Sequence, residues 1–441
     1  MVTVAATMAW PAANVHAGSG FELRSQSATT LGSAQAGMTA GAADLTAMIF
    51  NPAALAYGAG TEGAIGATGL STSVKFSETD ATTVLGTPIS GNQGGNAGTK
   101  VAVPNVYLAT GLSDDVRLGL AVAPRFGLGS YWSRDWVGRY YGLDSKLTTV
   151  DLVPSISIKT GESLSFGLGV DVEYAKITTS GAIDFGTIDT VLTGGAFGGV
   201  PARSDGATAL NAHGWGVGMV AGIVYEPRRG TRIGVDYHSQ IRQLLHGDAT
   251  FAAGGPVGQA IGAVTGAFKG TSLSSDFVAP ATAAVGIYQE ISPASAVMVD
   301  VKWTHWQALQ DLQVTFGNPT QPPVRTDFSW HDSWFVTAGG RYQLSDRVAL
   351  RYGVAYDQSP ARDATRNPII PDSDSYWVAA GLEYRYSRST KVDAAYGHIF
   401  ASDAPIGLKA TDPGNAFRGN LSGMIQDSHV DYFAVQLVHR F

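Results

Sequence analysis

The stretch SLSFGLGVDVEYAK, residues 163 to 176, alternates strictly between two kinds of side chain. One face is large and apolar, and the other is small or charged: Leu164, Phe166, Leu168, Val170, Val172 and Tyr174 against Ser165, Gly167, Gly169, Asp171 and Glu173. A period of two predicts a β-strand. This one exceeds the roughly five or six residues usual in a soluble sandwich. It matches a tilted strand that crosses a bilayer, with lipid on one side and a polar lumen on the other.

The same alternation recurs in three other stretches, GWGVGMVAGIVYE (214–226), TRIGVDYH (231–238) and RVALRYGVAYD (347–357). In these stretches aromatic residues lie at or near the ends of the apolar face. Tyr and Trp gather at the two interfaces of a membrane-spanning barrel. The pattern therefore favours a transmembrane barrel over a soluble sandwich.

Tight polar turns set the number of strands. Six of them join alternating segments, at 112–116, 159–163, 226–230, 291–295, 344–347 and 386–390. With a first strand at 62–76 and a last at 430–441, the count is fourteen, an even number as bacterial single-chain barrels require. Seven long connections lie between them, at 77–100, 126–148, 177–212, 240–278, 304–333, 358–374 and 400–428. The sequence thus predicts an all-β fold, a fourteen-stranded antiparallel transmembrane β-barrel with long loops at one end.

The chain ends on DYFAVQLVHRF, residues 431–441, with Phe433, Val435, Leu437 and Phe441 on one face. A final strand that closes on an aromatic residue is typical of outer-membrane barrels. No window reaches the roughly 20 apolar residues that a spanning helix needs.

Composition excludes several classes of function. The chain has no Cys, so it has no thiolate metal site or thiol nucleophile, and its net charge of −7 argues against nucleic acid as a partner. The glycines of GWGVG alternate within a strand, His213 and His238 lack the spacing of a metal site, and no Gly-x-Ser-x-Gly motif occurs. We expect no catalytic residues, no metal and no cofactor.

The N-terminal part lacks strand alternation. VTVAATMAWPAANVHA, residues 2–17, ends in Val15-His16-Ala17 and predicts an export signal over 1–17. Residues 18–60 are rich in small residues, and 37–50 predicts one short helix capped near Asp44 and ended by Asn51-Pro52. The alternative is that Asn51-Pro52 is only the turn that joins a leader to the first strand.

Several of these stretches resemble one family. GSGFELRSQSATTLGSAQAGMTAGAADLTAMIFNPAAL (18–55), VPNVYLATGLSDDVRLGLAVAPRFGLGSYW (103–132), WVGRYYG, WTHWQAL and YDQSPARDATRNPIIPDSDSYWVAAGLEYRY (356–386) are similar to FadL-type outer-membrane transporters of long-chain fatty acids and hydrocarbons. The resemblance covers nearly the whole chain. It implies a hatch over 18–60, including Gly20, Phe21, Asn51, Pro52 and Ala53, inside a barrel over 61–441. It also implies the outer membrane of a Gram-negative bacterium and lateral exit at a kinked third strand.

The third strand carries such an interruption. The stretch RLGLAVAPRFGLGSYW alternates through Val122 and then meets Pro124, which has no N–H for the ladder, followed by Arg125, Phe126 and Gly127. We interpret residues 124–127 as a lateral gate. The alternative is that Pro124 lies at the strand's outer end, beyond the membrane.

Two loops are too apolar for ordinary water-facing segments, at 190–200 and 250–270. They predict an apolar collecting surface, unless they only pack over the barrel mouth. A fatty acid head group would want a nearby cation, and the candidates are Arg125, Arg139, Lys302, His331 and Arg341. Lumen cations more often pair with acids, and an uncharged hydrocarbon would need none of them.

The expected function is passive uptake of long-chain fatty acids or other hydrophobic compounds; which of these is transported stays open. The alternatives are a general diffusion porin and, with less support, an outer-membrane lipid hydrolase. Expected partners are a hydrophobic small molecule and outer-membrane lipid, lipopolysaccharide or phospholipid, or detergent in crystals. We expect no nucleic acid partner and a monomer.

Overall fold

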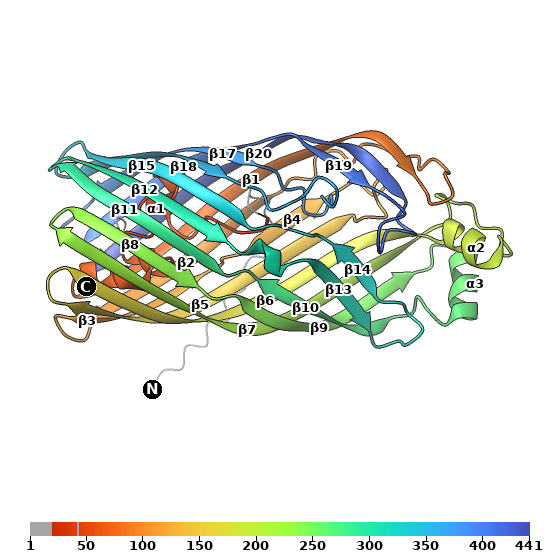
Figure 1. The fold of residues 1–441 in the computed structure, drawn as a ribbon, viewed down its shortest axis with the longest axis horizontal. Helices are drawn as coiled ribbons and strands as arrows, with labels where there is room; N and C mark the ends of the chain where they lie inside the picture. Colours follow the sequence, from red (N-terminus) through yellow and green to blue (C-terminus); the bar gives the residue numbers. More distant parts are fainter. Residues whose placement is uncertain (1–19, 42–43) are drawn as a thin grey trace.

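The computed structural model describes residues 20–41 and 44–441, which form a closed barrel of fourteen antiparallel strands (Figure 1). The predicted signal, residues 1–17, lies outside the described residues. Eight strands of the wall are unbroken: β1 (Thr61–Thr82), β2 (Lys100–Gly111), β5 (Asp144–Thr160), β6 (Leu164–Asp184), β7 (Asp205–Arg228), β16 (Val348–Asp357), β17 (Ser375–Arg385) and β20 (Asn420–Arg440).

Six strands of the wall are interrupted, and each therefore has two labels. They are β3 and β4 (Val116–Ala123, Gly127–Tyr131), β8 and β9 (Thr231–His238, Ile241–Ala252), β10 and β11 (Thr271–Ala279, Thr282–Ser292), β12 and β13 (Ser295–Thr304, Asp311–Phe316), β14 and β15 (Val324–Asp327, Ser333–Gln343), and β18 and β19 (Thr390–Ala401, Ala404–Leu408). The first and last strands pair along most of their length, from Glu62 with Arg440 to Thr82 with Asn420. This pairing closes the barrel and confirms the predicted strand number.

The two ends of the barrel differ. All six predicted tight turns join neighbouring strands at one end, on the left in Figure 1. The other end carries the long connections and two helices, α2 (Phe185–Thr193) and α3 (Pro256–Thr265). Outer-membrane barrels have short periplasmic turns and longer extracellular loops, which sets the orientation.

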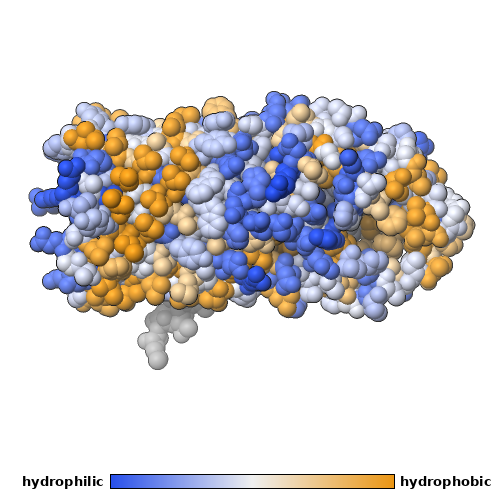
Figure 2. All heavy atoms as spheres, viewed as in Figure 1, coloured by the Kyte–Doolittle hydropathy of each residue, from blue (hydrophilic) through white to orange (hydrophobic). Residues whose placement is uncertain are grey.

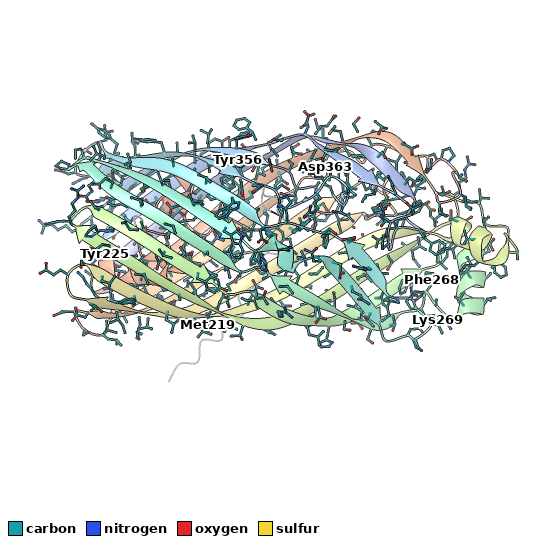
Figure 3. All side chains as sticks on the ribbon, in the orientation of Figure 1. Met219, Tyr225, Phe268, Lys269, Tyr356 and Asp363 are labelled. Atoms are coloured by element: carbon teal, nitrogen blue, oxygen red, sulfur yellow. The ribbon has the colours of Figure 1, made fainter. Side chains whose placement is uncertain are left out.

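An apolar band surrounds the half of the barrel nearest the tight turns. On β7 it runs from Trp215 to Tyr225, with Val217, Met219 and Ile223 exposed between them. That interval matches the roughly 9 to 11 residues of a tilted membrane strand. Figure 2 shows this band in orange, with a more hydrophilic zone beyond it, and Figure 3 labels Met219 and Tyr225 on the same strand. Within the described residues, no helix is long and apolar enough to cross a membrane.

The strands continue well beyond the apolar band, which corrects the predicted lengths of the long connections. The segments 177–212 and 240–278 were expected to be loops, yet they contain the end of β6, the start of β7, and all of β9 and most of β10. Past Trp215 the outward face turns polar, with His213 and Asn211. The apolar alternation ends where the lipid ends, although the hydrogen-bonded ladder does not.

The N-terminal segment, residues 20–41 and 44–58, is almost wholly buried and lies against the inner faces of the strands. It contains α1 (Ala28–Leu31) and two 3₁₀ helices, η1 (Leu45–Ile49) and η2 (Pro52–Tyr57). The expected single helix over 37–50 is wrong. Asp44 does cap a helix, as expected, but residues 32–41 form turns, and Asn51-Pro52 both ends one short helix and begins the next.

Candidate functional site

The Asn51-Pro52-Ala53 turn is seated against two glycines of the wall. The Asn51 Oδ1 accepts the Ala53 amide at 3.0 Å, and its Nδ2 donates to the Thr39 carbonyl at 2.8 Å. A Cβ on Gly222 would lie 2.0 Å from Asn51 Oδ1, and one on Gly167 would lie 2.1 Å from the Ala53 nitrogen. The small inner face of the strands is therefore the space into which this turn fits.

Buried charges hold the N-terminal segment to the wall. Arg24 pairs with Asp357 at 3.3 Å and lies 3.8 Å from the centre of the Phe335 ring. Asp44 pairs with Lys391 of β18 at 2.8 Å. Burial raises the pKa of the Asp44 carboxyl, but the charge of Lys391 together with hydrogen bonds from Lys391 and Thr46 lowers it below its usual value.

The interruption predicted in the third strand is present at residues 124–126. The strand pairs with β5 on both sides of it, from Ala123 with Asp151 to Gly127 with Thr148, so three residues oppose two and the strand bulges. On the other side β3 pairs with β2 only at 106–111. Among the described residues, no ladder joins the rest of β2, Lys100–Asn105, to β4.

The N-terminal segment supplies the missing partner from inside. The Leu23 amide donates to the Arg125 carbonyl at 2.8 Å, and the Gly127 amide donates to the Phe21 carbonyl at 2.9 Å. A Cβ on Gly127 would lie 2.8 Å from the Leu23 side chain. Residues 21–23 thus cover the inner side of the interruption as a short antiparallel bridge.

A packed cluster of buried aromatic side chains, called the chamber below, lies beside this bridge. The Phe21 ring lies 4.6 Å from Trp306 and 5.7 Å from Phe126 between ring centres, and Trp330 and Phe277 are 5.8 Å away. The surrounding apolar side chains come from strands on several sides of the barrel, among them Leu147, Leu245, Leu273 and Phe316, and from the connection 358–374, which contributes Ile370. Gly20, with φ of +69°, places its backbone against Trp330 and Trp306.

A chain of phenylalanines connects the chamber with the extracellular helices. Phe316 contacts Phe251 at 5.9 Å, Phe251 contacts Phe268 at 5.9 Å, and Phe268 contacts Phe185 at 4.9 Å between ring centres. Figure 3 shows Phe268 and Lys269 beside α3 at the loop end. The apolar loops predicted at 190–200 and 250–270 contribute to α2, α3 and their surroundings, and they expose Val191, Leu192, Val200 and Val264.

A buried cation cluster borders the chamber. Lys302 of β12 pairs with Glu22, and Arg24 lies 3.5 Å from the same carboxylate. Burial by itself raises the pKa of Glu22, but Lys302 and Arg24 outweigh it and lower the pKa to about 2, so Glu22 is ionised. Arg125 pairs with Asp171 at 2.9 Å. A cavity of about 20 Å³ between these groups has room for one water molecule.

The other candidate cations lie elsewhere. Arg139 pairs with Asp205 at 2.7 Å among the extracellular loops. The His331 Nδ1 lies 2.8 Å from the Asp332 carbonyl, outside the cluster. Arg341 lies 3.6 Å from Glu383 and lines an open vestibule of about 890 Å³ at the tight-turn end. Only Lys302 and Arg125 are brought together.

Sequence reasoning missed the inward course of the connection 358–374. Its Pro368 and Ile369 carbonyls accept from Trp132 at 3.0 Å and from Ser130 of β4 at 3.1 Å. Asp372 is buried, accepts the Ser359 hydroxyl at 2.5 Å, and is hydrogen bonded to the Gly20 amide. The connection therefore packs against both β4 and the N-terminal segment. Its alternation-free sequence gave no signal of this.

In the part of the chain that the structure describes, no group of three or more His, Asp or Glu side chains has the arrangement of a metal site.

The profile of the outer membrane protein transport protein family (OMPP1/FadL/TodX) matches residues 8–441. An outer membrane protein of Neisseria meningitidis serogroup B is 26% identical over 454 residues, which cover 98% of this chain and 97% of the relative. The long-chain fatty acid transport protein of Escherichia coli K12 is 25% identical over 428 residues, covering 92% of this chain and 91% of that protein.

Solved structures of the same architecture are also similar. A Pseudomonas aeruginosa FadL homologue superposes with a TM-score of 0.89 at 26% identity, covering 96% of this chain and 100% of that one. The Pseudomonas putida toluene transporter TodX superposes with a TM-score of 0.70 at 18% identity, covering 96% of this chain and 100% of TodX, a likeness of fold alone.

Proposed function

The chain belongs to the outer membrane protein transport protein family (OMPP1/FadL/TodX), and from that membership we propose that it takes up long-chain fatty acids passively. It is an outer-membrane transporter of hydrophobic compounds, and its family comprises transporters rather than enzymes. One observation carries the choice of a fatty acid: buried cations border the apolar chamber, with Lys302 paired to Glu22, the neighbour of Phe21 in the chain.

Capture begins at the extracellular end. The exposed apolar side chains of α2, α3 and the segments after them offer a surface for an acyl chain, and the row of phenylalanines leads inward from it. Burial of an acyl chain stabilises by about 0.8 kcal/mol per methylene. Burial of a dozen methylenes therefore outweighs the free-energy cost of transferring the molecule out of water. No precisely placed polar group is needed for this step.

The carboxylate of the incoming molecule binds Lys302 in this proposal. Lys302 pairs with Glu22, so an entering carboxylate competes with Glu22 for the same ammonium. Loss of the Glu22 pair loosens residues 21–23, whose amide and carbonyl groups bridge Arg125 and Gly127. The N-terminal segment, residues 18–60, then acts as a hatch, and exchange of one carboxylate for another opens it.

Exit follows through the wall rather than along the axis. The region between Lys100–Asn105 of β2 and β4 lacks a ladder among the described residues, and residues 21–23 cover it from inside. Displacement of these three residues joins the chamber to the lipid. Residues 124–127 are the lateral gate, and no energy source is required.

The Lys302→Met variant tests the proposal. Its binding affinity is measured with the full-length protein in detergent for two ligands, a long-chain fatty acid and the alcohol of equal chain length. We expect binding of the acid to weaken by about tenfold to about a hundredfold, because a hydrogen bond to a charged group contributes about 1.5 to 3 kcal/mol. Binding of the alcohol should not change. Arg341→Gln is the matched control, because it removes a cation outside the cluster.

The double variant Glu22→Gln/Lys302→Met leaves neither partner of the buried pair charged, so it separates loss of binding from misfolding. If the acid and the alcohol lose binding affinity equally, or if neither loses affinity, the proposed role of Lys302 in binding the head group is contradicted. Uptake of an alkane at the wild-type rate in every variant would favour uncharged hydrocarbons as the substrates.

A further inference from the structure

Four basic or titratable side chains form a row on the outer surface, across four neighbouring strands. Lys146 on β5 and Lys176 on β6 are diagonal neighbours, because Thr148 is the partner of Lys176 and Thr178 the partner of Lys146. Lys176 lies opposite His213 of β7, which lies opposite His246 of β9. All four point outward, by the alternation of burial along their strands.

The row lies at the outer edge of the apolar band. On β6, Lys176 follows Tyr174 on the outward face, and on β7, His213 precedes Trp215. The rings of Tyr174 and Trp215 are 5.0 Å apart, and Trp215 is 65% exposed. Because Tyr and Trp mark the membrane interface, the next outward residue faces the head groups of the outer leaflet.

Elsewhere around the barrel, three basic side chains of the outward face are paired with acids. His305 follows Trp303 outward and contacts Asp332 at 3.0 Å, and His398 contacts Asp431 at 2.8 Å next to Phe433. Lys75 contacts Asp427 at 3.2 Å.

No ion pair is present for Lys146 or Lys176 within residues 20–41 and 44–441. Three acids lie near the row on the same outward face: Asp144 two residues before Lys146, Asp248 two residues after His246, and Asp276 diagonally across from His246 on β10. Asp144 accepts the Ser180 hydroxyl at 2.7 Å, and Asp248 lies beyond His246 on β9. Lys146 and Lys176 are therefore two adjacent ammonium groups, and neither lies within ion-pair distance of an acid among the described residues.

We propose that this row, Lys146, Lys176, His213 and His246, binds a phosphate group of lipopolysaccharide in the outer leaflet. Two lysines supply the charge, the histidines add donors, and the Tyr174–Trp215 pair packs against the acyl chains below. Ammonium groups at a membrane surface attract anionic lipid. The site adjoins the interrupted strand, because Lys146 is the β5 partner of Gly129 in β4.

The test measures lipid binding by native mass spectrometry on the full-length protein, with three probes: lipid A, lipid A without its phosphates, and inorganic phosphate. Lys146→Gln/Lys176→Gln should bind lipid A roughly 25-fold more weakly, since each lysine near an anionic surface adds roughly a fivefold gain in affinity. Lys146→Arg/Lys176→Arg should bind like the wild type. Lys75→Gln/Lys159→Gln is the matched control, with two lysines removed from other parts of the surface.

Folding of each variant is checked by the shift in gel migration on heating, and the arginine variant keeps the test valid if the glutamine variant folds poorly. Stronger binding of phosphorylated than of dephosphorylated lipid A, lost in the glutamine variant alone, supports the site. Equal binding of the two lipids, an equal loss in the control, or inorganic phosphate bound as tightly as lipid A would overturn it.

Discussion

At the scale of single residues, Asn51 explains the Pro-broken stretch in front of the barrel. Its side chain caps η2 and reaches the carbonyls of Ile223 and Val235 in two wall strands, both at 3.3 Å. The following Pro52 lacks an N–H, which suits the first position of a helix. The motif that breaks one short helix therefore also fastens the segment to the wall.

Replacement of Gly222 by alanine should loosen this contact. The new Cβ would lie 2.0 Å from Asn51 Oδ1. We expect a loss of about 1 to 3 kcal/mol in stability, the usual cost of overpacking. The temperature at which the folded gel band disappears measures it. Gly69→Ala is the control, because its Cβ would meet no atom closer than 3.7 Å; equal effects of the two substitutions would contradict the seating of Asn51 on Gly222.

Residue types alone predicted part of the candidate site. Lys302 and Arg125 were among the expected cations because they lie in or beside strands, and the structure brings them together. The sequence did not single out Glu22 and Arg24, which complete the cluster, because they lie in a segment without alternation and no register links them to the wall. Arg139, His331 and Arg341 looked equivalent to Lys302, and only three-dimensional pairing separates them.

At the scale of elements, the third strand combines a bulge with an uncovered edge. Deletion of Pro124 makes two residues oppose two between Ala123 and Gly127, so β3 and β4 become one continuous strand. We expect fatty acid uptake by cells that carry this deletion to fall to background, with folded protein in the membrane at the normal level. Pro154→Val, in the adjacent β5, is the control and should transport normally. Normal uptake by cells with the deletion variant would contradict the proposal that residues 124–127 form a lateral gate.

The connection 358–374 should respond to pH through Asp372. Burial raises the pKa of its carboxyl from 3.8 to about 8. The packed connection therefore holds a proton that a solvated carboxyl loses, so its stability falls as pH rises from about 4 to about 8. Hydrogen exchange of its amides, corrected for intrinsic rates, should show more opening at pH 9 than at pH 6.

Asp372→Asn keeps a neutral side chain and should abolish this dependence. Asp363→Asn, an exposed acid of the same connection (Figure 3), should retain it. A pH response that persists in Asp372→Asn would assign the effect to another group.

Elements were predictable where lipid imposes a pattern. The tight turns and the membrane-crossing halves of the strands followed from alternation, because one face meets hydrocarbon there. Beyond the lipid both faces of β7 and β9 tolerate polar residues, so their outer parts were taken for loops. The turns at 32–41 had no periodicity at all.

At the scale of the whole molecule, the lumen is filled rather than open. The N-terminal segment is buried against strands on several sides of the barrel, and charges tie it to β16, β12 and β18. Protein reconstituted in planar bilayers should therefore pass little steady ion current, in contrast to a general porin measured alongside it. Large steady currents would instead support the alternative function, a general diffusion porin.

The outer parts of the strands have a consequence for where molecules are collected. From Trp215, at the membrane edge, β7 continues to Asp205 beside α2. About ten residues at about 3.3 Å each, on a strand tilted by about 40°, raise the helices roughly 25 Å above the lipid. That distance places α2 and α3 among the sugars of the lipopolysaccharide, a layer that greasy molecules cross poorly. On the proposed route, α2 and α3 therefore meet hydrophobic molecules inside this hydrated layer, and the lateral gate returns the molecules to the membrane beneath it.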